Sequence, residues 1–439
     1  MEGIPVAGNA CLVVGAGISG LTAAHQLKQA GQDVLVLEAK NRVGGRMITV
    51  EWQGFRFDPG AKFVTTSDRF LLDLAHQLDL EEQIRKIEEG LTITIYRNSQ
   101  LHTANFLSIG SYLRWGGVSL SARLAMLKLI PYLLRAMRLK NVYHLEQAPG
   151  GDVDETFETF FDRHISREMF EYWAIPMFET MCSYTGEDVS RKAFVAMLAG
   201  YLNADSIGFR DGIGILPETL AKHLEVELNA RVENITPYAD GSGVAVAYTQ
   251  NGTHKTLQAR RVVVAVQGNR VLDLFPDPAP AWREFFPKVH YSNTAMQFHI
   301  AETDFQPEVP GTFIPRSTGK PINAIGFEEF KDDHWLILTD PSVYTFRLDE
   351  DESVLIERAT RVMAEVFPEL EGTFRAHRIF RWPEKVPTFR PGYLNALAQF
   401  WEDPQENPIY FCGDYFAGPS TGGALYSGRE AALRLLDTI

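Results

Sequence analysis

Cysteine is scarce in this chain. Only three cysteines, Cys11, Cys182 and Cys412, occur among 439 residues, and they lie far apart. This spacing supports neither a disulfide framework nor a cluster of metal ligands, so we expect reduced thiols, a cytoplasmic protein and no metal site.

Long apolar runs are also missing, and we expect no leader peptide. No stretch approaches the roughly 18 consecutive apolar residues of a membrane-spanning helix. The first ten residues, MEGIPVAGNA, carry no basic cluster, so we expect no signal peptide. The net charge of -14 argues against a nucleic-acid partner. With 45% hydrophobic residues, the chain can bury a large core, and we expect two or three domains.

One window of this acidic chain has no acidic residue at all. Residues 91–145 contain no Asp or Glu, but seven Lys and Arg residues. Residues 119–140 combine helix formers with basic residues along one side, and Pro131 predicts a kink or a new helix start. The pattern is typical of a helix on an anionic membrane, or of an apolar substrate mouth. It is also typical of a helical subdomain that buries its apolar face on the rest of the protein.

The stretch VVGAGISGL, residues 13–21, links a predicted buried strand to a predicted helix at residues 17–30. Three of its glycines have the G-x-G-x-x-G spacing, which allows a tight turn, close approach of a pyrophosphate and helix–strand packing. The helix N-terminus would add the positive end of its dipole. The predicted cofactor-binding residues of this loop are Gly15, Ala16, Gly17, Ile18, Ser19 and Gly20.

A second predicted strand, residues 33–37, ends at Glu38. The Glu38 carboxylate can accept hydrogen bonds from both hydroxyls of an adenosine ribose, which favours an unphosphorylated ribose. Two glycines and two arginines follow shortly after. They suit the long cofactor FAD better than NAD, because bare backbone and a guanidinium can both meet the pyrophosphate. We therefore predict FAD contacts at Glu38, Ala39, Arg42, Gly44, Gly45 and Arg46, with Arg46 pairing with phosphate.

These N-terminal motifs resemble the flavin-containing amine oxidoreductase superfamily, which includes monoamine and polyamine oxidases, protoporphyrinogen oxidases and carotenoid desaturases. Residues 409–432, IYFCGDYFAGPSTGGALYSGREAA, resemble the closing FAD motif of that superfamily. The resemblance implies that Gly413 and Asp414 lie near the ribityl or phosphate region. It also implies that backbone N–H groups of a helix start point at the flavin N1 and O2 edge, where negative charge develops on reduction. The residues so implied are Gly423, Ala424 and Leu425.

The resemblance implies an α/β fold. We expect a Rossmann-like FAD-binding domain of the glutathione-reductase type, an interleaved α+β substrate domain and a helical subdomain. The predicted FAD-binding segments are residues 1–75, 209–270 and 386–439, the substrate domain takes residues 76–100 and 271–385, and the helical subdomain takes residues 101–208.

Further contacts to the cofactor are expected from three places. Gly60 and Ala61 are small enough to let the flavin ring approach. Val232 lies in a predicted meander with an Asn-Gly hairpin turn, and its backbone would meet the adenine. Lys62 is the candidate catalytic side chain, pairing with a substrate carboxylate or with the reduced flavin. The alternative is a surface lysine at the edge of a loop.

The residues expected where the substrate would meet the flavin lack the usual amine-oxidase features. In amine oxidases of this superfamily a lysine lies on the substrate-domain strand, but the matching strand here, residues 291–300, has none. An aromatic pair is not apparent either, since the corresponding C-terminal position is closest to Thr421. No cysteine occurs at residues 387–392 or 418–423, so we expect noncovalent FAD.

Residues 382–393, WPEKVPTFRPGY, resemble the protoporphyrinogen-oxidase branch. Thr388 and Tyr393 replace the Gln and His that are common there, which leaves the substrate open. Aromatic residues that either line a substrate pocket or simply pack in the core are Tyr184, Phe209, Tyr291, Phe389 and Tyr393.

The sequence thus predicts an FAD-dependent oxidoreductase. It would remove hydride from a C–H or C–N unit of a hydrophobic or heterocyclic substrate, and oxygen or a quinone would reoxidise the flavin. The alternatives are an amine oxidase that produces hydrogen peroxide and a carotenoid-type desaturase. A binding protein on the same fold, similar to the GDP-dissociation inhibitors, is a more distant alternative.

Overall fold

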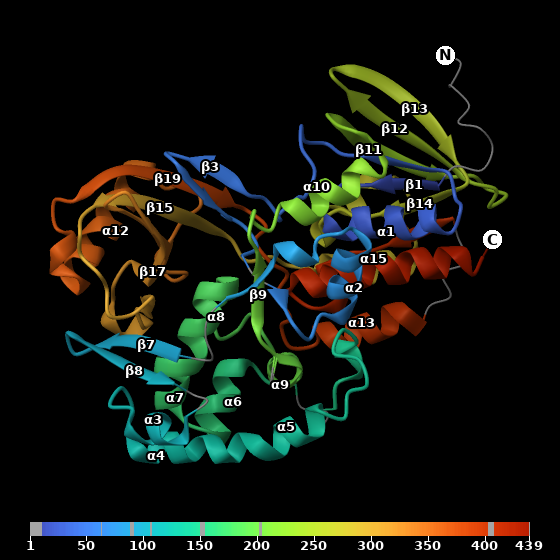
Figure 1. Ribbon diagram of the computed structural model, residues 1–439. Coiled ribbons are helices and arrows are strands. Elements are labelled where there is room, and N and C mark those ends of the chain that lie inside the picture. The colour runs from blue at the N-terminus through green and yellow to red at the C-terminus, as the bar shows by residue number, and fades with distance from the viewer. Residues whose placement is uncertain are drawn as a thin grey trace.

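Three regions make up the molecule (Figure 1): an α/β part built from both ends of the chain, a sheet-rich part and a helical base. The computed structural model describes residues 11–62, 64–87, 92–105, 108–149, 154–201, 204–402 and 408–438.

A five-stranded parallel sheet organises the α/β part. Its strands, in order, are β10 (Glu225–Glu227), β2 (Val34–Leu37), β1 (Cys11–Val14), β14 (Arg261–Val264) and β20 (Ile409–Phe411). β1 is buried along its whole length, as expected for a strand covered on both faces. The strands come from three distant stretches, and each stretch lies within one of the predicted FAD-binding segments.

Helices α1 (Ile18–Gln29) and α15 (Thr421–Leu436) lie side by side beneath this sheet (Figure 1). A Cβ atom at Gly428 would overlap the carbonyl oxygen of Ser19, so this glycine is what lets the two helices approach. The first and last motifs of the sequence are therefore neighbours in space.

The second region is a seven-stranded, mostly antiparallel sheet with both faces covered. Its order is β19 (Phe374–Trp382), β15 (Thr294–Glu302), β18 (His334–Pro341), β17 (Ile322–Lys331), β16 (Gly311–Phe313), β7 (Thr92–Arg97) and β8 (Gln100–Asn105). Helix α12 (Glu352–Val366) packs on one face through Ala359 and Val362. The hairpin of β3 (Val50–Trp52) and β4 (Phe55–Phe57) packs on the other, where the ring centroids of Phe57 and Phe298 are 4.2 Å apart.

Two smaller sheets flank these regions. The predicted meander consists of β11 (Ala230–Pro237), β12 (Val244–Gln250) and β13 (Thr253–Ala259), and the other sheet of β5 (Val64–Thr65), β9 (Ser206–Phe209) and β6 (Ile84–Lys86). Asn251 and Gly252 have φ angles of 49° and 81°, as the predicted Asn-Gly hairpin turn requires.

The remaining helices form the base and the links. They are α2 (Arg69–Gln77), α3 (Ile109–Arg114), α4 (Leu120–Ala125), α5 (Ile130–Ala136), α6 (Phe157–His164), α7 (Arg167–Met169), α8 (Ile175–Cys182), α9 (Arg191–Tyr201), α10 (Ile215–Lys222), α11 (Pro280–Phe285), α13 (Tyr393–Glu402) and α14 (Asp414–Ala417). Pro131 lies in the first turn of α5, after a 3-10 turn, η2 (Met126–Leu129), that separates α5 from α4. Within the described ranges, no helix is both long enough and apolar enough to cross a membrane.

Candidate functional site

The two N-terminal glycine motifs contact each other at the N-terminus of α1. Gly17 and Gly44 form a parallel β-bridge, and the Gly44 N–H donates to the carbonyl of Ala16 at 2.8 Å. The Arg42 guanidinium braces this loop by donating to the carbonyls of Val43 and Gly45, at 3.2 and 3.0 Å. The two stretches therefore build one backbone surface.

The glycines of the first motif have different roles. Gly15 has a φ of +106°, and a Cβ there would lie 2.8 Å from the carbonyl oxygen of Ala265. A Cβ at Gly20 would overlap the carbonyl oxygen of Gly15. Gly17 has an ordinary φ of -70°, and a Cβ there would meet no atom within 4 Å. Packing thus requires Gly15 and Gly20, whereas Gly17 leaves open space at the N-terminus of α1.

Glu38 is held at the carboxyl end of β2. Its Oε2 accepts the Ala16 N–H at 2.8 Å and its Oε1 accepts the Lys40 N–H at 2.8 Å, while the residue is 8% exposed. A carboxylate oxygen can accept more than one hydrogen bond, so both oxygens retain capacity for a ligand hydroxyl. Ala39, the next residue, is exposed.

Arg46 joins the N-terminal and C-terminal motifs. One guanidinium nitrogen lies 2.8 Å from Asp414 Oδ2 and also donates to the carbonyl of Lys385 at 2.9 Å. Burial lowers the pKa of Arg46, but Asp414, Tyr291 and Glu384 together more than offset this, so the pKa is raised overall. Asp414 Oδ1 is buried and has no hydrogen-bond partner among the described residues.

The carbonyl of Arg46 also fixes the loop of Gly60 and Ala61. The Ala61 N–H donates to it at 3.1 Å, and a Cβ at Gly60 would overlap its oxygen. The loop predicted to let the flavin ring approach is therefore tied directly to the Arg46–Asp414 pair.

The N-terminus of α15 departs from the expected set of donors. The Ser420 side chain accepts the Gly423 N–H at 2.9 Å, and the Ser420 carbonyl accepts the Ala424 N–H at 3.0 Å. Leu425 is fully buried in the second turn. The N–H groups that have no acceptor in the described parts of the chain belong to Thr421 and Gly422. The N–H groups of Gly423 and Ala424 are thus already bonded, because Ser420 acts as the N-cap, and their contact with the flavin stays a prediction.

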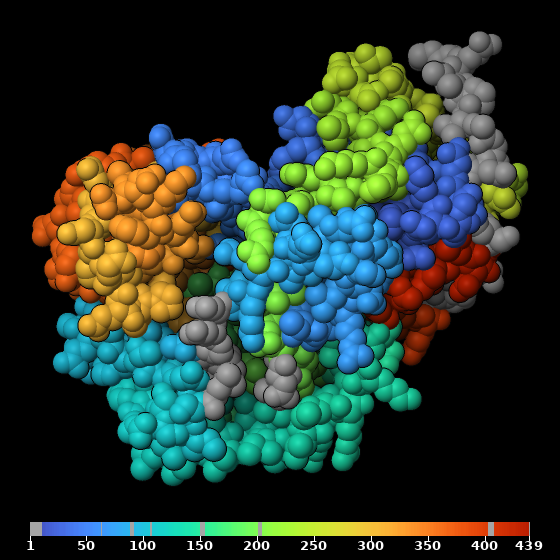
Figure 2. Space-filling model, viewed as in Figure 1, coloured from blue at the N-terminus to red at the C-terminus, as the bar shows by residue number. Residues whose placement is uncertain are grey.

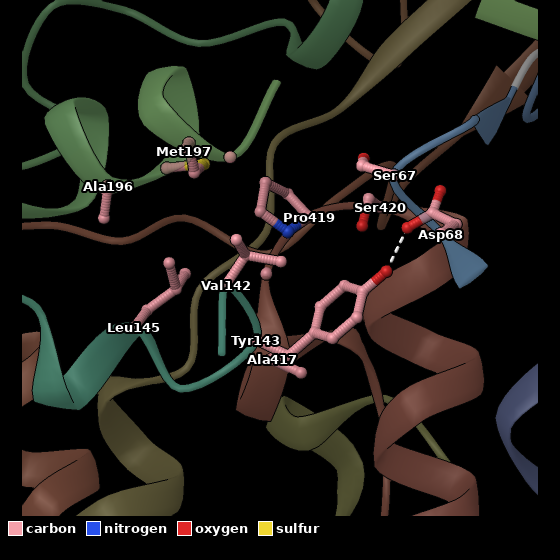
Figure 3. A pocket seen from close by; sticks show the side chains of 12 residues that line it. Ser67, Asp68, Val142, Tyr143, Leu145, Ala196, Met197, Ala417, Pro419 and Ser420 are labelled. Carbon is pink, nitrogen blue, oxygen red and sulfur yellow. Dashed lines mark hydrogen bonds between the residues drawn. The ribbon is translucent and has the colours of Figure 1, made fainter. Parts of the chain in front are cut away.

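A small cavity of about 30 Å³ lies beside this helix start (Figure 3). Ser67, Asp68 and Tyr143 lie at one end, where the Tyr143 hydroxyl donates to the Asp68 carboxylate. Burial raises the pKa of Asp68. The other walls include Ala196 and Met197 from α9.

Lys62 is held by a partner distant in sequence. Its Nζ lies 2.5 Å from Glu328 Oε1 on β17, and 5.6 Å from the ring centroid of Phe298 on β15. The contact ties the first predicted FAD-binding segment to the seven-stranded sheet, and the catalytic role of Lys62 stays a prediction. Val232 is buried at a bulge of β11, and its contact with adenine also stays a prediction.

Four of the five candidate substrate aromatics, Tyr184, Tyr291, Phe389 and Tyr393, belong to or pack against one core cluster, whereas Phe209 lies in another. Tyr184, Phe209, Phe389 and Tyr393 are buried in the core, where the Tyr184 hydroxyl donates to the Pro387 carbonyl and the Tyr393 hydroxyl donates to the Tyr415 carbonyl. Tyr291 lies in the site: its ring centroid is 5.8 Å from the guanidinium carbon of Arg46, and burial raises its pKa. Core packing, the alternative noted for these residues, therefore describes four of the five.

Lys385 is a site residue that the sequence did not single out. Its N–H donates to the Ser292 carbonyl at 2.8 Å, beside the strand that has no lysine of its own. Its Nζ donates to the Thr180 carbonyl at 3.1 Å and to Ser183 Oγ at 2.9 Å, which caps the C-terminal end of α8. The available signal was a lysine next to Glu384 in the stretch WPEKVPTF, residues 382–389.

Comparison with known proteins agrees with this geometry. The model of the family "Flavin containing amine oxidoreductase" matches residues 18–436. Protoporphyrinogen oxidase 2, chloroplastic/mitochondrial, of Arabidopsis thaliana is 25% identical over 506 residues, which cover 97% of this chain and 94% of that protein.

Two solved structures share the fold. A putative protoporphyrinogen oxidase from Exiguobacterium sp. 255-15 has a TM-score of 0.77 at 16% identity, and a variant of putrescine oxidase has a TM-score of 0.79 at 19% identity. Each comparison covers 98% of this chain and 99% of the other. The match to the family model spans nearly the whole chain, and the chain belongs to the flavin-containing amine oxidoreductase family, whose members are flavin-dependent oxidoreductases.

Proposed function

We propose that the chain binds FAD noncovalently at the carboxyl edge of the parallel sheet. The observation that carries this proposal is the open space at Gly17, flanked by Glu38 and the Arg46–Asp414 pair. Glu38 would hold the adenosine ribose, and the backbone at Gly17 and Gly45 would hold the pyrophosphate with Arg46.

Two further groups fit the flavin end of the cofactor. The buried, unpartnered Asp414 Oδ1 can accept a hydrogen bond from a ribityl hydroxyl. The N–H groups of Thr421 and Gly422, at the positive end of α15, would stabilise negative charge on the N1 and O2 edge. They replace Gly423 and Ala424 in this role because Ser420 already accepts those N–H groups.

The bound flavin would supply hydride acceptance from a carbon of the substrate. The protein then has to orient the substrate and exclude water. Lys62 stays the candidate side chain for a substrate carboxylate, and this role requires it to exchange its partner Glu328.

For the substrate we propose a hydrophobic or heterocyclic molecule, oxidised in the manner of a protoporphyrinogen oxidase, with oxygen or a quinone as acceptor. The support is a match to a protoporphyrinogen oxidase along nearly the full length of both chains. Amine oxidation is the second candidate, because the matching family model is that of the amine oxidoreductases.

An anaerobic titration separates these candidates. The protein is loaded with FAD, and bleaching of the flavin band at about 450 nm is followed with porphyrinogens, amines and polyenes. We expect a porphyrinogen to bleach the band. Bleaching by amines alone would establish the second candidate, and a protein that cannot be loaded with FAD would contradict the proposed function.

We also propose that the helical base contacts an anionic membrane surface. Ala122, Leu129 and Ala136 form its buried seam, and larger apolar side chains point outward. Eight of the eleven exposed large apolar residues of the described chain lie here: Ile109, Leu113, Leu120, Leu124, Leu127, Ile130, Leu134 and Met137. Figure 2 shows this part as the teal lower margin of the molecule. The seven basic residues and absent acids of residues 91–145 suit an anionic surface.

A further inference from the structure

A hollow lies beside the β7–β8 hairpin, which Figure 1 shows between β17 and the helices α3 and α4 of the base. The β7–β8 turn, η4 (Phe170–Ala174), residues 317–320 and α12 line it, and no lining residue belongs to the set that we assign to FAD. The hollow is open to solvent and offers about 250 Å³ to water-sized molecules. This space holds several waters or one small polar group.

Arg97, which lines this hollow, has unused hydrogen-bond donors. Its Nη1 donates to the carbonyl of Gly117 at 2.6 Å and to Glu168 Oε1 at 2.8 Å. Its guanidinium carbon lies 3.9 Å from the ring centroid of Tyr172, so the planar group is stacked and fixed in orientation. Nε and Nη2 donate to no residue in the described parts of the chain. This edge of the guanidinium can therefore donate two parallel hydrogen bonds to an oxyanion.

Lys320 adds a second cation to the lining. Its side chain is 15% exposed, its Nζ lies 5.6 Å from the ring centroid of Tyr96, and it pairs with Glu365. The side chain of Glu365 is 51% exposed. Because an ion pair with so exposed a carboxylate contributes little stability, an incoming anion can replace Glu365 at Lys320.

Hydroxyl groups complete the lining. Ser99, Ser317 and Thr318 line the hollow, and Ser317 Oγ donates to the Tyr172 hydroxyl at 3.2 Å. The lining as a whole carries two basic side chains against one carboxylate. An arginine edge, a lysine and several hydroxyls are groups that hold the oxygens of a phosphate.

The hollow also adjoins the surface proposed to contact a membrane. Glu168, which accepts from Arg97, accepts from both the N–H and the hydroxyl of Ser119 as well. Ser119 caps α4, whose Leu120 and Leu124 are exposed. Arg97 is therefore joined through one carboxylate to the start of the apolar base.

We propose that this hollow binds a phosphate group, carried by a lipid headgroup or by a soluble phosphate ester. The Nε and Nη2 atoms of Arg97 and the Nζ of Lys320 hold the phosphate oxygens, and Glu365 turns outward into solvent. Binding forms no covalent bond and does not depend on the chemistry proposed for the flavin. Only the lipid source rests on the proposed membrane contact.

Calorimetric titration tests the site directly. The protein is saturated with FAD, so that the cofactor's own phosphate site is filled, and is titrated with inorganic phosphate or glycerol 3-phosphate at constant ionic strength. We expect Arg97→Gln to weaken binding of both at least about tenfold, because the charge and the paired donors are lost. Arg375→Gln should leave the affinity unchanged, since it removes an exposed guanidinium at β19, the other edge of the same sheet.

Glu365→Gln distinguishes loss of the site from damage to the fold. It removes the carboxylate that competes for Lys320, so we expect it to tighten phosphate binding at least about threefold, which a misfolded hollow would not do. The proposal is overturned if the wild type binds phosphate no better than chloride. Equal affinities in the wild type, Arg97→Gln and Arg375→Gln would overturn it too.

Vesicle sedimentation identifies the source of the phosphate. With vesicles of phosphatidylcholine and phosphatidic acid, a lipid source predicts that Arg97→Gln lowers the partition coefficient at least about fivefold more than Arg375→Gln does. Equal partition of these variants, together with loss of phosphate binding in Arg97→Gln, assigns the site to a soluble ester. Leu127→Glu with Leu134→Glu should leave phosphate affinity unchanged, so failure of the membrane contact is distinguished from failure of this site.

Discussion

At the scale of single residues, we expect opposite effects from alanine substitutions at Gly17 and Gly20, although these glycines lie only three positions apart. A methyl group added at Gly17 would lie in open space, and the backbone of Gly17 already has a conformation that alanine can adopt. We expect Gly17→Ala to change the free energy of unfolding of the cofactor-free protein by less than about 0.5 kcal/mol. The methyl would occupy the place of the pyrophosphate, so FAD affinity should fall at least tenfold, or about 1.4 kcal/mol. Flavin fluorescence quenching and thermal melting measure the two quantities.

Gly20→Ala is the matched control. Its methyl would overlap the carbonyl oxygen of Gly15, so we expect the cofactor-free protein to lose about 1–3 kcal/mol of stability. If Gly17→Ala bound FAD as tightly as the wild type, the proposed place of the pyrophosphate would be wrong.

The Arg46–Asp414 pair gives a second expectation at this scale. Asp414 is 5% exposed and the Arg46 side chain is 29% exposed, so Asp414→Asn leaves a largely buried guanidinium with a weaker partner. We expect a loss of about 2–3 kcal/mol in urea unfolding, below the full cost of breaking a buried pair because solvent screens part of it. Glu357→Gln at the exposed Arg361 pair should cost less than about 1 kcal/mol. Equal losses in both variants would show that Arg46 is not anchored by Asp414.

At the scale of elements, the local sequence pattern predicted the strands and helices near the site. The predicted helix at residues 17–30 is found as Ile18–Gln29, because glycine spacing and an apolar run define both of its ends. The site contacts were harder to predict, since they depend on distant residues. Glu328, the partner of Lys62, lies 266 positions away, and the bond from Arg46 to Lys385 spans 339 positions. At α15, the capping by Ser420 bonds two of the N–H groups that the resemblance assigns to the flavin.

The buried His299 and the half-buried His377 couple β15 to β19. His299 Nδ1 lies 2.8 Å from His377 Nδ1, and His299 Nε2 lies 2.9 Å from Thr339 Oγ1. Burial lowers the pKa of His299 to about 3 and also lowers that of His377. Because the unfolded chain binds protons more readily, stability should fall as the pH drops below about 6.5, the ordinary histidine pKa, and continue to fall toward about 3.

The slope of the free energy of unfolding against pH identifies His299 as the residue responsible. His299 alone should contribute up to about 1.4 kcal/mol per pH unit between about pH 6 and pH 4. Urea unfolding across this range, compared between the wild type and His299→Gln, isolates the term from the other titrating groups. Parallel stability curves would show that His299 titrates normally in the folded protein.

At the scale of the whole molecule, positive charge and exposed apolar side chains are concentrated in the same region. The chain carries a net charge of -14, yet residues 91–145 carry only positive charges. The same stretch holds most of the exposed large apolar side chains, on α3, α4, η2 and α5. Solvation alone favours charged residues at such positions, so the combination supports the proposed contact with an anionic, apolar partner.

A vesicle-sedimentation experiment decides whether that partner is a lipid bilayer. We expect binding to vesicles that contain phosphatidylserine, weaker binding to phosphatidylcholine alone, and a decrease with salt, because the basic residues act through screened charge. Leu127→Glu with Leu134→Glu should reduce the partition coefficient at least about tenfold, since two apolar anchors are lost and two anionic groups face the lipid. Phe330→Glu, an exposed apolar position on β17, should have no effect. Equal binding to both kinds of vesicle, or loss of binding in the Phe330 variant, would mean that the helical base is not the membrane surface.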